Sequence, residues 1–336
     1  MSADSRDVER GVLDAMRRAL GREDVKAVIG WRRGSFGLRT RPLLAYDAAQ
    51  LSDAVYNPLC AANPATYLPL EQKERPPLRR GEAPDARKTA VVLRGCESRS
   101  LMVQLQEHVV AREAVHVIGV PCQGVVDHHM LSLTLGCEPR GPWAIEWRND
   151  DLVLTLDGRE RVLPANEVLL SKCRECPHPV PLVYDELVDS PARNPTRLDY
   201  DAVRRIEAMP PKQRFEFWQQ QLSRCIRCHA CRNVCPQCSC PDCILERLNP
   251  VWIRRENVPR ETWLYHFTRA YHLTGRCTYC GECERVCPVG IPLLLLYKKL
   301  QKDAAELFGF EAGVKMEDEP LFSCATPNEL EGFGGG

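Results

Sequence analysis

The sequence of 336 residues lacks the features that mark several common classes of protein. No apolar run approaches the ~20 residues of a membrane-spanning helix, and the longest, at 291–297, predicts a buried helix instead. The 45 basic residues are balanced by 45 acidic ones, so charge gives no support to a nucleic-acid partner. The amino-terminal segment has neither the apolar core of a signal peptide nor a twin-arginine pair beside one. We therefore expect a cytoplasmic globular protein.

The sequence is also poor in recognisable catalytic arrangements. No G-x-G-x-x-G follows a predicted strand, so a Rossmann dinucleotide site is not supported. No paired carboxylates and no nucleophile with a nearby base stand out, and the scattered histidines are typical of surface or core positions. No catalytic residue is predicted.

Cysteine, in contrast, is abundant and clustered, with 18 in the chain. The segments CIRCHACRNVCP at 225–236 and CTYCGECERVCP at 277–288 share the pattern C-x-x-C-x-x-C-x-x-x-C-P. Bacterial ferredoxins hold 4Fe-4S clusters with this run. Paired structural zinc sites are the alternative, but those favour two C-x-x-C pairs over runs of four. The clustered spacing and the lack of a signal peptide favour reduced thiolates in a cytoplasm.

The spacing within each run predicts that the two clusters share their ligands crosswise. Three cysteines two residues apart reach three corners of one cube, whereas the fourth lies one helical turn onward and points away. We therefore expect Cys225, Cys228, Cys231 and Cys287 at cluster 1, and Cys277, Cys280, Cys283 and Cys235 at cluster 2. This arrangement would join both runs into one cooperative unit, because metal binding contributes to folding.

Three further cysteines, Cys238, Cys240 and Cys243, follow the first run within a few residues. They could supply an alternative fourth ligand, bind a separate metal, or pack as thiols around the cluster. The third reading is favoured because each cluster already has four candidate ligands. Cys324, near the glycine-rich end, has no partner in the sequence and is interpreted as incidental.

The first half of the chain predicts an α/β domain with a small parallel or mixed sheet. Helix 6–20 precedes strand 26–31, and an apolar strand at 88–95, helix 98–110 and strand 115–121 form a unit typical of two parallel strands. Alternation in 152–163 around Asp157-Gly158 predicts a hairpin.

The second half predicts a mainly helical dicluster ferredoxin-like domain. One helix, at about 211–224, precedes the first run, and another, at about 261–274, lies between the two runs. The proline-rich, polar segment between the halves reads as a linker. The expected domains are the α/β domain at 1–190, the linker at 191–200, the dicluster domain at 201–310 and a tail at 311–336.

Cysteines of the first half follow predicted strand ends. Cys96 and Cys122 each come just after a parallel strand, so both should lie at the carboxyl edge of the sheet, where ligands gather. Cys173 and Cys176 follow the hairpin and complete a set of four thiolates, enough for a third 4Fe-4S cluster. The alternatives are buried structural thiols for the first pair and a zinc half-site or redox dithiol for the second. Cys60 and Cys137 are possible substitutes.

The order RGC, VIGVPCQG and KCRECPHPVPLVYDELV resembles the beta-subunit family of deazaflavin (coenzyme F420)-reducing hydrogenases and formate dehydrogenases. The resemblance covers about 25–190, and the chain looks closest to iron–sulfur subunits of heterodisulfide-reductase-like and formate-dehydrogenase-like complexes. It implies one 4Fe-4S cluster, here on Cys96, Cys122, Cys173 and Cys176, and an FAD in the first domain. The segment after the C-x-x-C, PHPVPLVYDEL, departs from the family's acidic continuation and weakens the case for deazaflavin chemistry.

The segment that best fits an FAD-binding site in the sequence is WRRGSFGLRTRP at 31–42. Arg32, Arg33, Gly34 and Gly37 could cradle a pyrophosphate through backbone amides and guanidinium groups. A solvated basic turn explains the same residues.

Two functions fit these patterns. The first is an electron-transfer subunit that relays electrons through 4Fe-4S clusters between other redox subunits, such as a formate dehydrogenase catalytic subunit, a hydrogenase or a heterodisulfide-reductase-like subunit. The second is an FAD- and cluster-containing oxidoreductase acting on a nicotinamide or deazaflavin cofactor. The first is favoured, because cluster motifs are plain and a substrate site is not.

Overall fold

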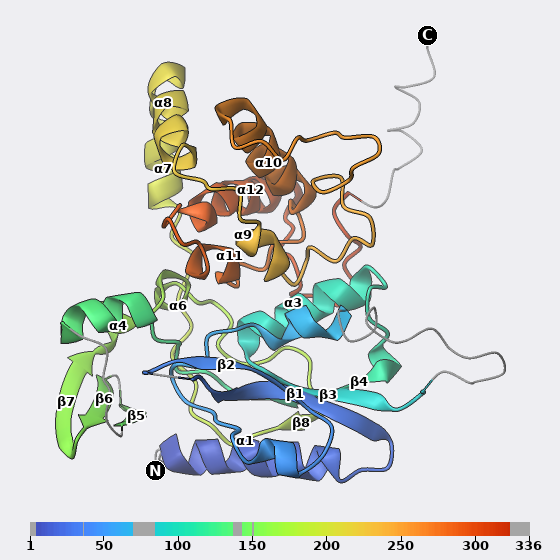
Figure 1. The fold of residues 1–336 in the computed structure, drawn as a ribbon, viewed down its shortest axis with the longest axis vertical. Coiled ribbons are helices and arrows are strands. Elements are labelled where there is room, and N and C mark those ends of the chain that lie inside the picture. The colour runs from blue at the N-terminus through green and yellow to red at the C-terminus, as the bar shows by residue number, and fades with distance from the viewer. Residues whose placement is uncertain (1–4, 36, 70–84, 137–142, 150, 323–336) are drawn as a thin grey trace. The chain divides into compact units, whose positions relative to one another are not determined.

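A computed structural model describes residues 5–35, 37–69, 85–136, 143–149 and 151–322 (Figure 1). Cys137 and Cys324 lie outside these described residues. The chain divides into two compact units, one of residues 1–99 and 110–198 and one of residues 100–109 and 199–336. Within the described residues, no helix is long and apolar enough to cross a membrane.

A five-stranded mixed sheet forms the centre of the first unit, in the order β2-β1-β3-β4-β8. Strand β2 runs antiparallel to β1, whereas β1, β3, β4 and β8 are parallel neighbours. The predicted parallel pairing of the strands at 88–95 and 115–121 is confirmed as β3 with β4. The strands are β1 Val25–Arg33, β2 Thr40–Ala45, β3 Lys88–Leu93, β4 Val115–Gly119 and β8 Glu186–Leu187.

Helix α1, Ser5–Leu20, covers one face of this sheet, as the sequence predicted for 6–20 (Figure 1). Its Val12 and Met16 are buried with the sheet residues Val28 and Trp31 in one apolar core. Burial of such side chains, at about 25 cal/mol per Å² of apolar surface, holds the helix on the sheet.

A second, three-stranded antiparallel sheet has the order β5-β6-β7. Its strands are β5 Trp143–Arg148, β6 Asp151–Leu156 and β7 Arg159–Pro164. The predicted hairpin is confirmed, because β6 pairs with β7 and the turn residues Asp157 and Gly158 both have positive φ. Helix α4, His128–Leu135, packs its buried Leu131 into the core of this sheet.

Short helical elements complete the first unit, and one longer helix is divided between the two units. Helix α3, Gly95–Gln106, follows β3 directly, and its residues from Ser100 onward group with the second unit. The short elements are η1 Ala49–Leu51, η2 Pro64–Thr66, η3 Arg112–Ala114, α5 Ala165–Val168 and α6 Ser171–Arg174.

Every regular element in the described part of 199–336 is a helix. The helices predicted at 211–224 and 261–274 are confirmed within two residues as α8 and α10. The apolar run at 291–297 begins α12, in which Leu293, Leu294, Leu296 and Tyr297 are buried. The helices are α7 Asp201–Glu207, α8 Pro211–Leu222, α9 Ala230–Asn233, α10 Pro259–His272, α11 Glu282–Arg285 and α12 Leu293–Phe308.

The two cysteine runs fold alike. In the first run Arg227 and His229 have φ of 55° and 61°, and the equivalent Tyr279 and Gly281 of the second run have 58° and 76°. A short helix, α9 or α11, follows at once in each run. Positive φ costs free energy in residues with a side chain. Three such non-glycine residues at matched positions therefore indicate a loop conformation that is retained for function.

Candidate metal centres

The first candidate centre gathers cysteines from both runs. One pocket of the second unit is lined by Cys225, Cys228, Cys231 and Cys287. Cys287, although 56 positions from Cys231, lies close enough to raise the pKa of both Cys225 and Cys231, to which burial makes the larger contribution. The fourth cysteine of the second run thus lies with the first three of the other run.

Several donors point at these sulfurs. The backbone N–H groups of Arg227 and Ile291 donate to Cys225 Sγ and Cys287 Sγ, each at 3.4 Å. Tyr265 Oη lies 3.6 Å from Cys231 Sγ, and His266 Nε2 lies 3.3 Å from Cys225 Sγ. Burial lowers the pKa of His266 to about 3, so this ring is neutral. Donors of this kind stabilise thiolate charge, which metal ligation requires.

The second candidate centre gathers Cys277, Cys280, Cys283 and Cys235. Burial raises the pKa of the Cys283 thiol well above its usual range, and the nearby Cys277 and Cys280 sulfurs raise it further. Cys235, from the first run, has its pKa raised by a hydrogen bond to Cys238, by burial and by charges that include Cys280. The structure therefore brings Cys235 toward the second run.

Arg269 is a buried cation among the cysteines of both centres. Its side chain is 1% exposed, one Nη donates to Cys231 O at 2.9 Å, and the other donates to Tyr297 Oη. Its Nε has no hydrogen-bond partner among the described atoms. Burial opposes its charge, but Tyr297, Cys235, Cys238 and Cys283 hold its pKa well above the ordinary value. A buried cation needs negative charge nearby, and the groups that raise the pKa of Arg269 are a tyrosine and cysteines rather than carboxylates.

The three extra cysteines have different surroundings. Cys238 contacts Cys235, and mainly because of that hydrogen bond the pKa of Cys238 is lowered to about 6. Arg232 Nε donates to Cys243 Sγ at 3.4 Å, whereas Cys240 is exposed. Their role stays a prediction.

The third candidate centre lies in the first unit, where Cys96, Cys122, Cys173 and Cys176 come together. Burial raises the pKa of Cys122 to about 12, opposed by Arg94, and the Cys173 and Cys96 sulfurs raise it further. Burial likewise raises the pKa of Cys176 to about 12, again with contributions from Cys96 and Cys173. Among the described residues, no three His, Cys, Asp or Glu side chains converge as they would on a single metal ion.

A close backbone approach brings the C-x-x-C segment to Cys96. A Cβ on Gly95 would lie 1.8 Å from His178 O, so only glycine allows this contact. Next to it, Cys122 N–H donates to Pro179 O at 2.9 Å. These contacts explain why glycine precedes the cysteine in RGC.

The segment expected as a linker holds the third centre from outside. Arg193 N–H donates to Cys122 O at 2.9 Å, and Thr196 N–H donates to Cys176 O at 2.8 Å. Residues 189–200 form neither helix nor strand. Nothing in the polar sequence of this segment predicts that it packs against the cysteines of the third centre.

The sulfurs of the third centre also receive donors. Gly124 N–H donates to Cys122 Sγ at 3.2 Å, Val125 N–H donates to Cys173 Sγ at 3.4 Å, and Lys172 Nζ donates to Cys96 Sγ at 3.7 Å. The buried Lys172 was not singled out in the sequence, although it directly precedes a cysteine.

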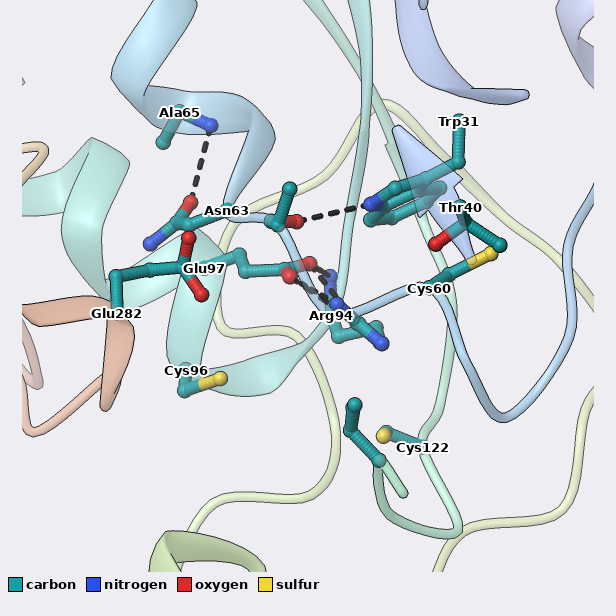
Figure 2. A network of polar contacts seen from close by, with 12 residues as sticks. Trp31, Thr40, Cys60, Asn63, Ala65, Arg94, Cys96, Glu97, Cys122 and Glu282 are labelled. Atoms are coloured by element: carbon teal, nitrogen blue, oxygen red, sulfur yellow. Dashed lines mark hydrogen bonds and ion pairs between the residues drawn. The ribbon is translucent and has the colours of Figure 1, made fainter. Parts of the chain in front are cut away.

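A buried ion pair borders this centre. Figure 2 shows Arg94 joined to Glu97, with Cys96 and Cys122 nearby. The Arg94 guanidinium lies 4.8 Å from the centroid of the Trp31 ring. Cys60, one of the two possible substitute ligands, is fully buried and donates to Val55 O at 3.7 Å.

A cavity of about 240 Å³ adjoins Cys122. Its walls include the aromatic side chains Tyr56, Trp143 and Trp147 and the cations Arg33 and Arg94. Aromatic walls with a few charged groups are typical of a small-molecule site. Sequence patterns did not reveal it, because its walls come from separate elements of the first unit.

Of the four residues expected to bind FAD, Arg33 lines this cavity, whereas Arg32, Gly34 and Gly37 are not among the lining residues. Gly37 O accepts a hydrogen bond at 3.0 Å from the indole N–H of Trp143. The Arg33 guanidinium lies 5.6 Å from the centroid of the same ring.

Comparison with known proteins agrees with this description. Residues 221–291 match the family described as a 4Fe-4S dicluster domain. The chain is 32% identical over 108 residues to F420-dependent formate dehydrogenase subunit beta of Methanocaldococcus jannaschii, which is 32% of this chain and 28% of that protein. It is 32% identical over 114 residues to F420-dependent formate dehydrogenase 1 subunit beta of Methanococcus maripaludis, which is 34% of this chain and 29% of that protein.

A solved structure of the F420-reducing [NiFe] hydrogenase complex from Methanosarcina barkeri aligns with a TM-score of 0.38 at 15% identity, over 52% of this chain and 63% of that chain. The match to the curated relatives spans less than a third of their length. The resemblance seen in the sequence is confirmed: about a third of the chain is similar to beta subunits of F420-dependent formate dehydrogenases, and residues 221–291 match a 4Fe-4S dicluster domain.

Proposed function

We propose that this chain is an iron–sulfur electron-transfer subunit of a redox complex, with residues 1–190 as its α/β domain and 201–310 as its dicluster domain. The observation that carries this proposal is the pocket lined by Cys225, Cys228, Cys231 and Cys287. It unites cysteines from two runs that share one backbone conformation. When bound, each 4Fe-4S cluster accepts and releases electrons singly.

The residues present fit such clusters. Cys225, Cys228, Cys231 and Cys287 would hold cluster 1, and Cys277, Cys280, Cys283 and Cys235 would hold cluster 2. The buried Arg269 supports this assignment, because its cation would be balanced by the negative charge of both ligand sets. Backbone N–H groups would stabilise the thiolates, and α10 and α12 would exclude water from them.

A third cluster is proposed on Cys96, Cys122, Cys173 and Cys176. Support comes from the contributions of the Cys96 and Cys173 sulfurs to the raised pKa values of Cys122 and Cys176, and from the backbone donors at Gly124 and Val125. Lys172 and Arg94 supply positive charge to the same place. Cys60 is not proposed as a ligand.

Anaerobic reconstitution tests this function. Three clusters require about 12 iron and about 12 acid-labile sulfide per chain, and two require about 8 of each. Substituting Cys96 with serine should remove one cluster and leave the EPR signals of the other two. An iron content near 8 that Cys96→Ser leaves unchanged would end the proposal of a third cluster.

A second candidate function is an oxidoreductase with a bound flavin, and the cavity beside Cys122 favours it. Its aromatic walls suit a flat ring system, and Arg33 would offer charge to an anionic group. The position next to a candidate ligand would allow electrons to pass from the flavin to a cluster. Its donor would be a nicotinamide or deazaflavin cofactor, as the names of the relatives suggest for the second.

Denaturation of the reconstituted chain tests this alternative. One flavin released per chain would support it, whereas none after reconstitution with excess FAD would remove it. Trp143→Ala should weaken FAD binding because its ring lines the cavity, and Trp263→Ala, an aromatic change in the second unit, serves as the control.

The proposed partners of this chain rest only on its similarity to named subunits of redox complexes. The relatives are named as subunits of formate dehydrogenases, so we propose that this chain exchanges electrons with a formate dehydrogenase catalytic subunit, a hydrogenase or a heterodisulfide-reductase-like subunit. Co-purification with proteins encoded beside it would test this.

A further inference from the structure

The candidate centre around the first run is most exposed to solvent at Cys228. Of its four cysteines, Cys228 is exposed, whereas Cys225 and Cys287 are partly covered and Cys231 is buried. A cluster held there would come nearest to solvent at Cys228. This is where an external electron carrier could approach.

Exposed apolar and basic side chains occur in the segments that adjoin Cys228. Ile226 is 54% exposed and Trp252 is 57% exposed. Exposed arginines complete a surface that we call the Cys228 surface, made of Arg224, Ile226, Cys228, Trp252, Arg255 and Arg260. An apolar centre with a charged rim is typical of a protein interface.

Hydrogen bonds fix these residues beside the first run. Arg227, between Cys225 and Cys228, donates to Arg254 O at 2.9 Å and also to Glu261 O. Arg255 and Arg260 directly adjoin these two acceptors in the chain. On the other side, Arg224 donates to Gly290 O at 3.2 Å, close to Cys287.

The segments that adjoin Cys228 carry an excess of positive charge. In residues 211–228 and 248–260, six basic side chains are solvent-accessible against two carboxylates. The chain as a whole has equal numbers of basic and acidic residues. On the adjoining segment, Asp242 and Glu246 are each paired with an arginine, so they do not cancel this excess.

We propose that the Cys228 surface is the docking site of a small one-electron carrier protein with an acidic surface. The proposal rests on the proposed electron-transfer function, and specifies where electrons enter or leave the dicluster domain. Complementary charge would steer the carrier to the exposed edge of cluster 1 and speed its encounter. Ile226 and Trp252 would form the apolar contact in the bound pair.

Stopped-flow reduction of the reconstituted full chain tests the proposal, with reduced acidic plant-type ferredoxin as the probe. In the double variant Arg255→Glu and Arg260→Glu, the second-order rate constant should fall about tenfold at low ionic strength. The difference should shrink at about 0.5 M salt, where charges are screened. Both side chains are exposed, so iron content and folding should be unaffected.

A matched control reverses two exposed charges elsewhere in the second unit, Arg205→Glu and Lys315→Glu. Its rate constant should stay within about twofold of the original chain, because steering depends on local charge. Reduction by dithionite should be equal in all three proteins.

Two results would overturn the docking site alone: an unchanged rate in the Arg255/Arg260 variant, or an equal fall in the control. A reconstituted chain with three clusters that ferredoxin does not reduce would also overturn it. A chain that binds no iron would instead overturn the proposed function together with the docking site. Iron content therefore distinguishes the two failures.

Discussion

Arg269 offers the sharpest test of whether the second unit is built around clusters. Its guanidinium is buried beside Cys231, and the charges that most support it belong to Tyr297 and cysteines. We predict that Arg269→Met lowers the reduction potentials of both clusters in this unit. Removing a positive charge makes the addition of an electron less favourable.

The size of the effect follows from Coulomb's law. A unit charge about 7 Å from a cluster, at an effective dielectric constant of about 20, is worth about 2 kcal/mol. For a one-electron couple this corresponds to roughly 80–100 mV. EPR-monitored redox titration of the reconstituted variant would measure it. Arg269→Lys keeps the charge and should recover much of the potential.

The same variant should have opposite effects on stability with and without iron. In the iron-free chain at about pH 5, Cys235 and Cys283 are neutral because their pKa values are raised, and Cys238 is neutral because this pH lies below its pKa of about 6, so Arg269 is a poorly compensated buried charge. Replacing it by methionine should then raise the free energy of unfolding, by about 1 kcal/mol or more. With clusters bound, Arg269→Met removes the counter-charge of the clusters and should lower the free energy of unfolding.

Lys212→Met is the matched control for these measurements. Lys212 lies on α8, is exposed and pairs at 4.0 Å with Glu216, which is also exposed, so water screens its charge. Its loss should move the potentials by less than about 20 mV. Potentials in Arg269→Met that differ no more than this from the original chain would refute the role of Arg269.

Three further predictions concern the cysteines and their support. Cys235→Ser should alter the EPR signal of cluster 2 and spare that of cluster 1, whereas Cys238→Ser should leave both in place; damage to cluster 1 would contradict the crossed arrangement. Cys96→Ser should lower iron from about 12 to about 8 per chain, measured with acid-labile sulfide. Gly95→Ala should destabilise the first unit by ~2 kcal/mol or more in thermal unfolding, because the added Cβ would lie 1.8 Å from a carbonyl oxygen. Gly136→Ala, whose Cβ meets nothing within 4 Å, should cost only the ~1 kcal/mol of a positive φ.

Local patterns predicted the elements that carry the cysteines. The apolar strands ending before Cys96 and Cys122 are parallel neighbours, and this alone brings two sulfurs to one sheet edge. The Asp157-Gly158 turn was likewise visible, because its conformation depends on adjacent residues.

Long-range packing was beyond the sequence. Nothing near Arg269 in the chain indicates that its cation lies beside Cys231, which is 38 positions away. The cavity beside Cys122 is assembled from loops and strands of both sheets, and the segment at 193–196 looks like a polar linker until its hydrogen bonds are seen. These features depend on how distant segments meet, which neither periodicity nor spacing specifies.

Metal and sulfide analysis of the anaerobically reconstituted chain measures directly whether its cysteines hold 4Fe-4S clusters. We expect about 12 iron and about 12 acid-labile sulfide per chain, with EPR signals of reduced 4Fe-4S clusters that interact magnetically. A chain that instead binds about two zinc ions and no sulfide would contradict this expectation, because structural zinc carries no electrons.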